Sequence, residues 1–234
     1  MLIAANFKTN KTRAQTVEYY RAVSGYITEN GISSEAMIFP PATALESFEG
    51  SISVGTQNAY AVENGAFTGE IGLEQLDEFG IKTILIGHSE RRHILGESQE
   101  ELVVKFNYFK EQGFTIVYCI GEPLEVREEG SEALMDYLDD QLEGIDLDYE
   151  NLIIAYEPVW AIGTGLTPSA DEVELIHTAL RQKIESPILY GGSVKTANAE
   201  ELLALDNVDG ALIGSGALNV EDYCTILSIA ESLH

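Results

Sequence analysis

Glu157 is the residue of this 234-residue chain whose surroundings most clearly suggest acid–base chemistry. It follows an apolar run, 152–156, that is typical of a buried strand, and Pro158 and the only tryptophan, Trp160, come soon after it. A carboxylate on a rigid strand beside a small-residue loop suits an enzyme that takes a proton from carbon and keeps water away. Taken alone, the stretch is equally compatible with an ordinary acid between a strand and a turn.

Two other polar positions follow apolar runs. Lys8 lies on the same face of an N-terminal run as Asn6, because strand side chains alternate, and an ammonium group there would suit an anionic oxygen. His88 follows the run 83–87 and precedes residues that resemble the first turn of a helix. The positive end of a helix favours a neutral imidazole, which can donate to a carbonyl oxygen and pass a proton. A solvated lysine and a structural histidine are the alternatives.

Two glycine-rich turns suggest a phosphate site. Gly-Gly-Ser ends at Ser193, and Gly214, Ser215 and a further glycine form the second turn. Each follows a strand-like run, and glycines let backbone N–H groups approach an anion closely. The pair of turns is better evidence than either one alone.

Strand-like and helix-like segments alternate along the whole chain, with no linker or low-complexity tract. This pattern predicts a single (β/α)₈ barrel domain, 1–234, with site residues just past the strand ends. A doubly wound sheet is the alternative, but it favours a glycine-rich first turn, and this chain has Phe-Lys-Thr-Asn at 7–10. The expected strands are 2–6, 36–39, 51–54, 83–87, 115–119, 152–156, 188–190 and 211–213, and the clearest helices are 13–28, 97–111, 132–142, 170–184, 197–205 and 220–232.

The composition limits the partners. With 39 acidic against 13 basic residues the net charge is −26, so nucleic acid and anionic membranes are poor partners. An anionic substrate would have to be bound by local donors against this field. No apolar run is long enough to cross a bilayer, no secretory signal is visible, and two cysteines form no disulfide framework, so a cytoplasmic location is expected.

These residues give the chain an end-to-end resemblance to the triosephosphate isomerase family. The most specific matches are Gly-His-Ser-Glu-Arg-Arg at 87–92 and Glu-Pro-Val-Trp-Ala-Ile-Gly-Thr-Gly at 157–165. Asn-Phe-Lys at 6–8, Cys-Ile-Gly-Glu at 119–122 and Tyr-Gly-Gly-Ser-Val at 190–194 agree with them. The resemblance implies interconversion of dihydroxyacetone phosphate and D-glyceraldehyde 3-phosphate, without a metal or organic cofactor.

The resemblance also implies a role for each site residue. Glu157 would be the base, His88 the neutral electrophile, Lys8 the stabiliser of negative charge, and Asn6 a support for the substrate oxygens. The remaining roles fall to residues around these four. Backbone N–H groups of Gly163, Ser193, Gly214 and Ser215 would bind phosphate; 158–165, including Trp160, would form a lid held by Tyr190 and Ser193; Glu90 would orient Lys8; Ser89 would support the site; Cys119 would be structural.

The segment 64–70 resembles a loop that enters a neighbouring subunit. Thr68, Gly69 and Glu70 would contact the partner, with Thr68 near Asn6 of the partner subunit, which implies a symmetric homodimer. Two departures from the family pattern stand out. Only Leu166 separates Gly-Thr-Gly from Thr-Pro, which shortens one end of the lid, and Ser215 replaces a usual glycine, where a positive φ would be costly.

Two other functions stay open. A catalytically silent barrel that binds sugar phosphates would have the same fold, but it would typically have lost Glu157 or His88. A barrel enzyme for another phosphorylated aldose or ketose is the third hypothesis, and a small closed lid argues against a substrate larger than a triose.

Overall fold

The computed structural model describes residues 1–162 and 167–233 and contains eight parallel strands in one sheet. Their order around the sheet is β3-β2-β1-β8-β7-β6-β5-β4, so neighbours in sequence are neighbours in space. The strands are β1 (Leu2–Asn6), β2 (Glu35–Phe39), β3 (Ile52–Val54), β4 (Thr83–Ile86), β5 (Thr115–Ile120), β6 (Leu152–Tyr156), β7 (Ile188–Tyr190) and β8 (Gly210–Ile213).

The two ends of this sheet meet and close it into a barrel. Thr56, just past β3, forms a parallel bridge with Ile84 of β4. The Thr56 N–H donates to the Thr83 carbonyl, and the Leu85 N–H donates to the Thr56 carbonyl, both at 2.9 Å. With this short bridge the eight strands form a nearly closed barrel. The predicted (β/α)₈ fold is therefore confirmed.

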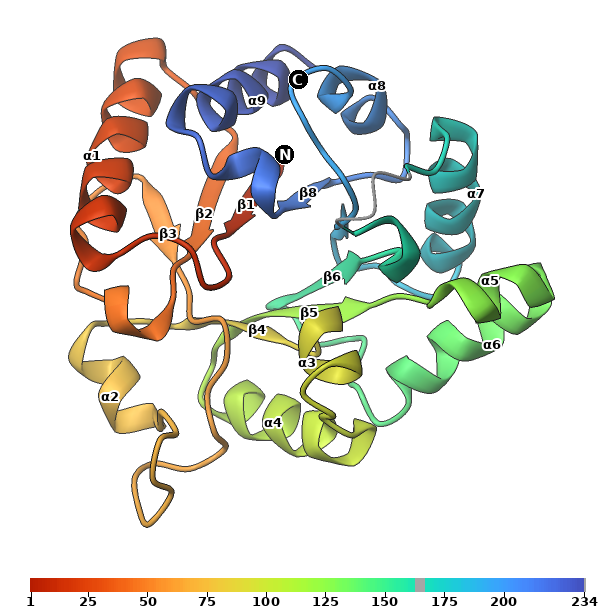
Figure 1. Ribbon diagram of the computed structural model, residues 1–234, viewed down its shortest axis with the longest axis horizontal. Helices are drawn as coiled ribbons and strands as arrows, with labels where there is room; N and C mark the ends of the chain where they lie inside the picture. The colour runs from red at the N-terminus through yellow and green to blue at the C-terminus, as the bar shows by residue number, and fades with distance from the viewer. Residues whose placement is uncertain (163–166, 234) are drawn as a thin grey trace.

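The helices form a ring around the strands (Figure 1). Several begin with a capping box, in which Ser or Thr and a Glu or Gln three residues later satisfy the first backbone N–H groups, as at Thr12, Ser98 and Ser169. The α-helices are α1 (Arg13–Asn30), α2 (Leu73–Glu78), α3 (Ser89–His93), α4 (Gln99–Glu111), α5 (Leu124–Glu129), α6 (Ser131–Leu142), α7 (Ala170–Arg181), α8 (Ala199–Leu203) and α9 (Val220–Ser232). Short 3₁₀ turns are η1 (Ala42–Ala44), η2 (Val159–Ala161) and η3 (Ser215–Ala217).

Strand alternation divides the apolar residues between two cores. Alternate residues such as Leu2, Ala4 and Leu212 fill the barrel interior, while Ile3 and Ala5 face the surrounding helices. The interior face of β1 continues through Asn6 into the mouth of the barrel, as the alternation predicts. The C-terminal end of the barrel therefore receives the polar side chains that end each strand.

The predicted strands agree with the observed ones to within a residue at each end, and the helices less closely. The short helices α2 and α5 were not predicted, because they follow Gly72 and Pro123 without a side-chain cap and have fewer than two turns. The predicted helix 170–184 ends at Arg181, whose guanidinium group donates to the Ile184 carbonyl and so stabilises the chain as it leaves the helix. Within the described ranges, no helix is both long and apolar enough to cross a bilayer.

Candidate active site

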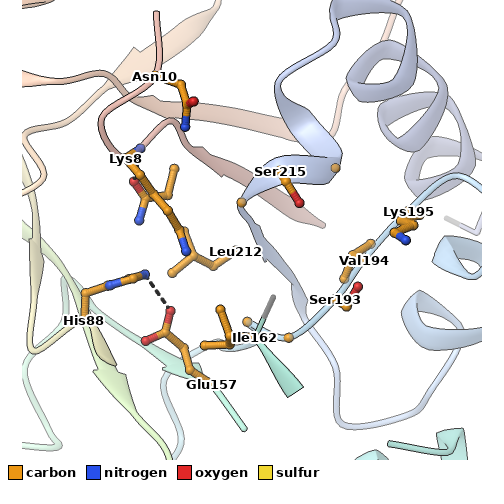
Figure 2. A pocket seen from close by; sticks show the side chains of 15 residues that line it. Lys8, Asn10, His88, Glu157, Ile162, Ser193, Val194, Lys195, Leu212 and Ser215 are labelled. Atoms are coloured by element: carbon orange, nitrogen blue, oxygen red, sulfur yellow. Dashed lines mark hydrogen bonds and ion pairs between the residues drawn. The ribbon is translucent and has the colours of Figure 1, made fainter. Parts of the chain in front are cut away.

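A pocket of about 430 Å³ lies at the C-terminal mouth of the barrel (Figure 2). Its walls come from the ends of β1, β4, β6, β7 and β8, which is where a barrel of this kind carries its chemistry. Seven residues predicted from sequence line it together: Asn6, Lys8, His88, Glu157, Ser193, Gly214 and Ser215.

Glu157 is held at the wall of the pocket by contacts to both carboxylate oxygens. The Ser89 N–H donates to Oε2 at 2.9 Å, and His88 Nε2 lies 3.0 Å from Oε1. The backbone is fixed as well, because the Glu157 N–H donates to the Ile120 carbonyl at 2.7 Å. A carboxylate with one oxygen on a backbone donor and one on an imidazole has a defined position from which to accept a proton.

Burial and these contacts act in opposite directions on the pKa of Glu157. The residue is 2% exposed, and burial alone would raise its pKa. The neighbouring His88 and Lys8 and the Ser89 N–H outweigh burial, so the pKa lies below its ordinary value. Glu157 is therefore ionised in the free protein at neutral pH, as a base must be.

His88 is the N-cap residue of α3. Its Nδ1 accepts a hydrogen bond from the Glu90 N–H at 3.2 Å, which places the proton of a neutral imidazole on Nε2, facing Glu157. Burial lowers the pKa of His88, but the Glu157 carboxylate, assisted by Glu90, raises it by more, so the pKa lies above its ordinary value. This direction is opposite to the effect expected from the helix terminus, and the neutral imidazole stays a prediction.

Lys8 is held in an unusual backbone conformation. Its φ is 51°, and apart from glycines only Lys8 and Lys11 have positive φ in the described part of the chain. Such a conformation costs about 1 kcal/mol, and hydrogen bonds offset it here. The Lys8 N–H donates to Asn6 Oδ1 at 2.9 Å, and Gln57 Nε2 donates to the Lys8 carbonyl at 2.8 Å. The positive φ that would have been costly at Ser215 does not occur; the strain lies at Lys8 instead.

The Lys8 side chain extends into the pocket and ends near the other polar groups (Figure 2). Its Nζ donates to Glu90 Oε1 at 2.8 Å, and the orienting role of Glu90 stays a prediction. Ser193 and Ser215 of the two glycine-rich turns lie across the pocket from Glu157 and His88. Only glycine fits at position 192, because a Cβ there would be 2.2 Å from the Tyr190 hydroxyl oxygen.

The supporting residues lie behind this wall. Cys119 is buried on β5, and burial raises the pKa of its thiol well above the ordinary value, which suits a structural role. Trp160 donates from Nε1 to Glu122 Oε1 at 2.8 Å. The Tyr190 hydroxyl is buried and has no hydrogen-bond partner in residues 1–162 or 167–233. The predicted lid contacts of Tyr190 and Ser193 stay predictions, because 163–166 lie outside the described residues.

Sequence reasoning missed three residues. Asn10 and Lys195 also line the pocket, and Glu122 is a fully buried carboxyl group whose pKa is raised by burial. Glu122 follows β5 just as His88 follows β4, so the same strand-end signal could have identified it. Of the other predicted residues, Gly163 lies outside the described residues.

The three residues Thr68, Gly69 and Glu70 are not part of this pocket. They belong to an exposed segment before α2, and Gly69 and Glu70 border a separate hollow together with Gln57 and Arg91. In the described ranges no cluster of three or more His, Cys, Asp or Glu side chains is placed to hold a metal ion.

Comparison with known proteins identifies relatives that are similar to this chain over nearly its whole length. The family model described as "Triosephosphate isomerase" matches residues 1–230. The chain is 58% identical over 233 residues to the triosephosphate isomerase of Sulfurimonas denitrificans, covering 100% of this chain and 97% of the relative. It is 55% identical to the Sulfurovum sp. protein of that name over 97% and 99% of the two chains, and 52% identical to that of Nitratiruptor sp. over 100% of both.

Proposed function

The chain belongs to the triosephosphate isomerase family, and on this premise we propose how its pocket interconverts dihydroxyacetone phosphate and D-glyceraldehyde 3-phosphate. The contact between Glu157 Oε1 and His88 Nε2, 3.0 Å apart beside Lys8, is the observation that carries the proposal. It brings a base and a proton donor to one place in the pocket. Such a pair can transfer protons at two adjacent carbon atoms of a substrate and at their oxygens.

Each group then has one task. Glu157 takes a proton from C1 of the ketose, which leaves an enediolate, and returns it to C2. The imidazole of His88 donates from Nε2 to the carbonyl oxygen and moves a proton between O1 and O2. The Lys8 ammonium stabilises the negative charge that develops on oxygen. Asn6 holds the substrate oxygens in place while their charge changes, so that bulk water is not needed to solvate them.

The phosphate end of the substrate is bound by the two turns. Ser193, Gly214 and Ser215 line the pocket on the side away from Glu157, and their backbone N–H groups would bind the phosphate, since a backbone N–H keeps its positive end at any pH. Local donors of this kind are needed because the net charge of −26 repels a dianion at long range. A pocket of about 430 Å³ is of a size for a small phosphorylated molecule.

A coupled assay of D-glyceraldehyde 3-phosphate isomerisation tests this function. Glu157→Gln keeps the shape of the side chain and removes the base, so kcat should fall by about 10²- to 10⁴-fold. Glu185→Gln changes an exposed carboxylate and serves as the matched control, with activity close to wild type. Wild-type activity no higher than that of Glu157→Gln would leave only a sugar-phosphate-binding barrel.

We also infer that two chains associate as a symmetric homodimer. The segment before α2 projects from the barrel at the lower left of Figure 1. It carries Phe67, 42% exposed, with its ring centroid 4.6 Å from that of Tyr60, which is 37% exposed. An exposed aromatic pair on a projecting segment is typical of an interface.

The hollow beside this segment is the expected receptor for the partner's loop. Gln57 borders the hollow and also donates to the Lys8 carbonyl, so a loop inserted there would support Lys8 from outside. Sedimentation velocity at micromolar protein should show a dimer. Phe67→Asp should dissociate it, whereas Leu175→Asp, at another exposed apolar residue, should not. A monomer with full activity would contradict this arrangement.

The remaining expectations are a single barrel domain over 1–234 and a cytoplasmic location. The closed eight-stranded sheet supports the first, because its first and last strands pair with each other. Two unpaired buried cysteines, Cys119 and Cys224, support a reducing compartment. Limited proteolysis and fractionation of cells would test them.

A further inference from the structure

Tyr19 of α1 lies behind the pocket and contacts both segments that would bind the anionic substrate. Its side chain is 1% exposed, and its hydroxyl donates to the Ala217 carbonyl at 2.7 Å. Its ring packs edge-on against Phe7, with ring centroids 4.8 Å apart. Phe7 precedes Lys8, and Ala217 ends the 3₁₀ turn that begins at Ser215. One side chain therefore connects residues 7–11, here called the lysine loop, with the turn 214–217 that would bind phosphate.

The turn containing Ser215 has little freedom on its other side. The Ala217 N–H donates to the Gly214 carbonyl at 3.1 Å, which closes the turn. A Cβ on Gly216 would be 2.1 Å from the Val194 carbonyl oxygen, so the turn lies directly against the loop after β7. The Tyr19 hydroxyl fixes the opposite side, and the backbone N–H groups between these contacts have a defined direction.

The lysine loop is held by the same ring. Lys11 places its Nζ 4.8 Å from the centroid of the Tyr19 ring and 5.5 Å from that of Phe7, within the range of a cation–π contact. The loop and the turn also lie close together, because a Cβ added to Gly214 would be 3.4 Å from Lys8 Cε. A change at Tyr19 would therefore alter the distance between the ammonium group and the turn.

We propose that Tyr19 is a positioning residue for the phosphate end of the substrate: its hydroxyl sets the Ser215 turn, and its ring sets the Lys8 loop, at a fixed separation. This role rests on the proposed isomerase function and adds a residue outside the pocket to it. Burial raises the pKa of the Tyr19 hydroxyl, which therefore remains a hydrogen-bond donor throughout the neutral range. The hydroxyl contributes to binding the phosphate and leaves proton transfer at Glu157 unchanged.

Tyr19→Phe tests the role, because it keeps the ring contacts and removes only the donor to the Ala217 carbonyl. We compare kcat/KM for D-glyceraldehyde 3-phosphate with kcat/KM for D-glyceraldehyde, which lacks the phosphate. The ratio of the two does not depend on how much of the variant is folded. It should fall roughly two- to tenfold, as loss of one net hydrogen bond implies. The change should appear in KM, with kcat for the phosphorylated substrate unaltered.

Tyr20→Phe is the matched control. Tyr20 is the next residue of α1, is also buried, and its hydroxyl is 3.4 Å from the Ile52 carbonyl oxygen on β3, away from the pocket. Its substrate ratio should equal that of wild type. The inhibition constant of inorganic phosphate should rise in Tyr19→Phe by the same factor as KM and stay unchanged in Tyr20→Phe.

The outcomes separate this role from the function it rests on. An inactive wild-type protein would remove the isomerase function itself. An active wild type whose substrate ratio is the same in Tyr19→Phe would overturn the positioning role alone. So would an equal loss with both substrates, because a general disturbance of the barrel would affect D-glyceraldehyde as much as its phosphate.

Discussion

Gly191→Ala should impair the base without removing it. A Cβ on Gly191 would be 2.7 Å from Glu157 Cγ and 3.1 Å from the Tyr156 carbonyl oxygen, whereas ordinary contacts begin near 3.4 Å. Gly191 has no positive φ, so its backbone can accept alanine, and the conflict falls on the side chain of Glu157. That side chain must move by about 0.7 Å to relieve it.

The size of the effect follows from the contacts of Glu157. Its oxygens are 2.9 Å from the Ser89 nitrogen and 3.0 Å from His88 Nε2, and a displacement of this size weakens both contacts. A misplacement near 1 Å costs up to about 10²-fold in rate, so we expect kcat to fall roughly 10- to 10²-fold. This corresponds to about 1.4 to 2.8 kcal/mol of transition-state stabilisation.

The assay is isomerisation of D-glyceraldehyde 3-phosphate as a function of pH. Because the Ser89 and His88 contacts lower the pKa of Glu157, weakening them raises that pKa, and the acid limb of kcat/KM should move to higher pH. Gly25→Ala is the control, since a Cβ there meets nothing within 4 Å. It should leave kcat unchanged and stabilise the helix by about 0.5 to 1 kcal/mol.

Two results would refute the reasoning. The first is a folded Gly191→Ala protein with wild-type kcat, because the base would then tolerate the added methyl group. The second is a loss of activity that follows loss of far-ultraviolet circular dichroism at the assay temperature. The cause would then be unfolding rather than displacement of Glu157.

Three further predictions concern stability and substrate capture. Burial lowers the pKa of His177 to about 4, against about 6.5 when unfolded, so the contribution of His177 to the unfolding free energy should be constant above pH 6.5 and fall by up to about 3 kcal/mol as the pH decreases from 6.5 to 4. Urea titrations across this range should lose most of that slope in His177→Gln. Glu97→Gln should cost about 3 to 5 kcal/mol in the same titration, because it leaves buried Lys105 without its anion, whereas Asp139→Asn, at a half-buried residue near the surface, should cost less than about 1 kcal/mol. Finally, kcat/KM for the dianionic substrate should rise about twofold or more between 10 and 200 mM NaCl, as salt screens the charge of −26, with no rise for uncharged D-glyceraldehyde; a decrease would contradict net repulsion.

Strands such as β1, β4 and β6 could be predicted from sequence because they are buried on both faces and are therefore nearly continuous apolar runs. Alternation then placed Asn6 and Lys8 on the face of Leu2 and Ala4; these two fill the barrel interior, and Asn6 and Lys8 line the pocket at its mouth. Short helices such as α2 could not be predicted in this way. Six residues make fewer than two turns, and packing of Leu73 and Leu76 determines α2 more than any periodic pattern does.

The site could be predicted to the extent that its residues follow strands. Glu157, His88 and Lys8 do so directly, whereas Tyr19 lies in the middle of a helix and resembles any other buried aromatic residue in the sequence. Its relation to the pocket depends on the path of the turn after β8, almost 200 residues later. The positive φ of Lys8 was also invisible, because it is stabilised by a hydrogen bond from the Lys8 N–H to Asn6 Oδ1 and by one from Gln57 to the Lys8 carbonyl.

The resting contacts of Glu157 determine how a substrate must bind. The His88 and Ser89 contacts that hold the carboxylate also lower its pKa, so in the free protein it is a weak base. A substrate carbonyl oxygen competes for the same proton on His88 Nε2. Once the carbonyl oxygen accepts that hydrogen bond, Glu157 loses a donor that lowers its pKa. Burial, which raises the pKa of Glu157, then has fewer contacts acting against it. In the proposed mechanism, substrate binding should thus strengthen the base, and the change should require a ligand that presents an oxygen to His88; a ligand that fills the phosphate turns alone should leave the pair intact.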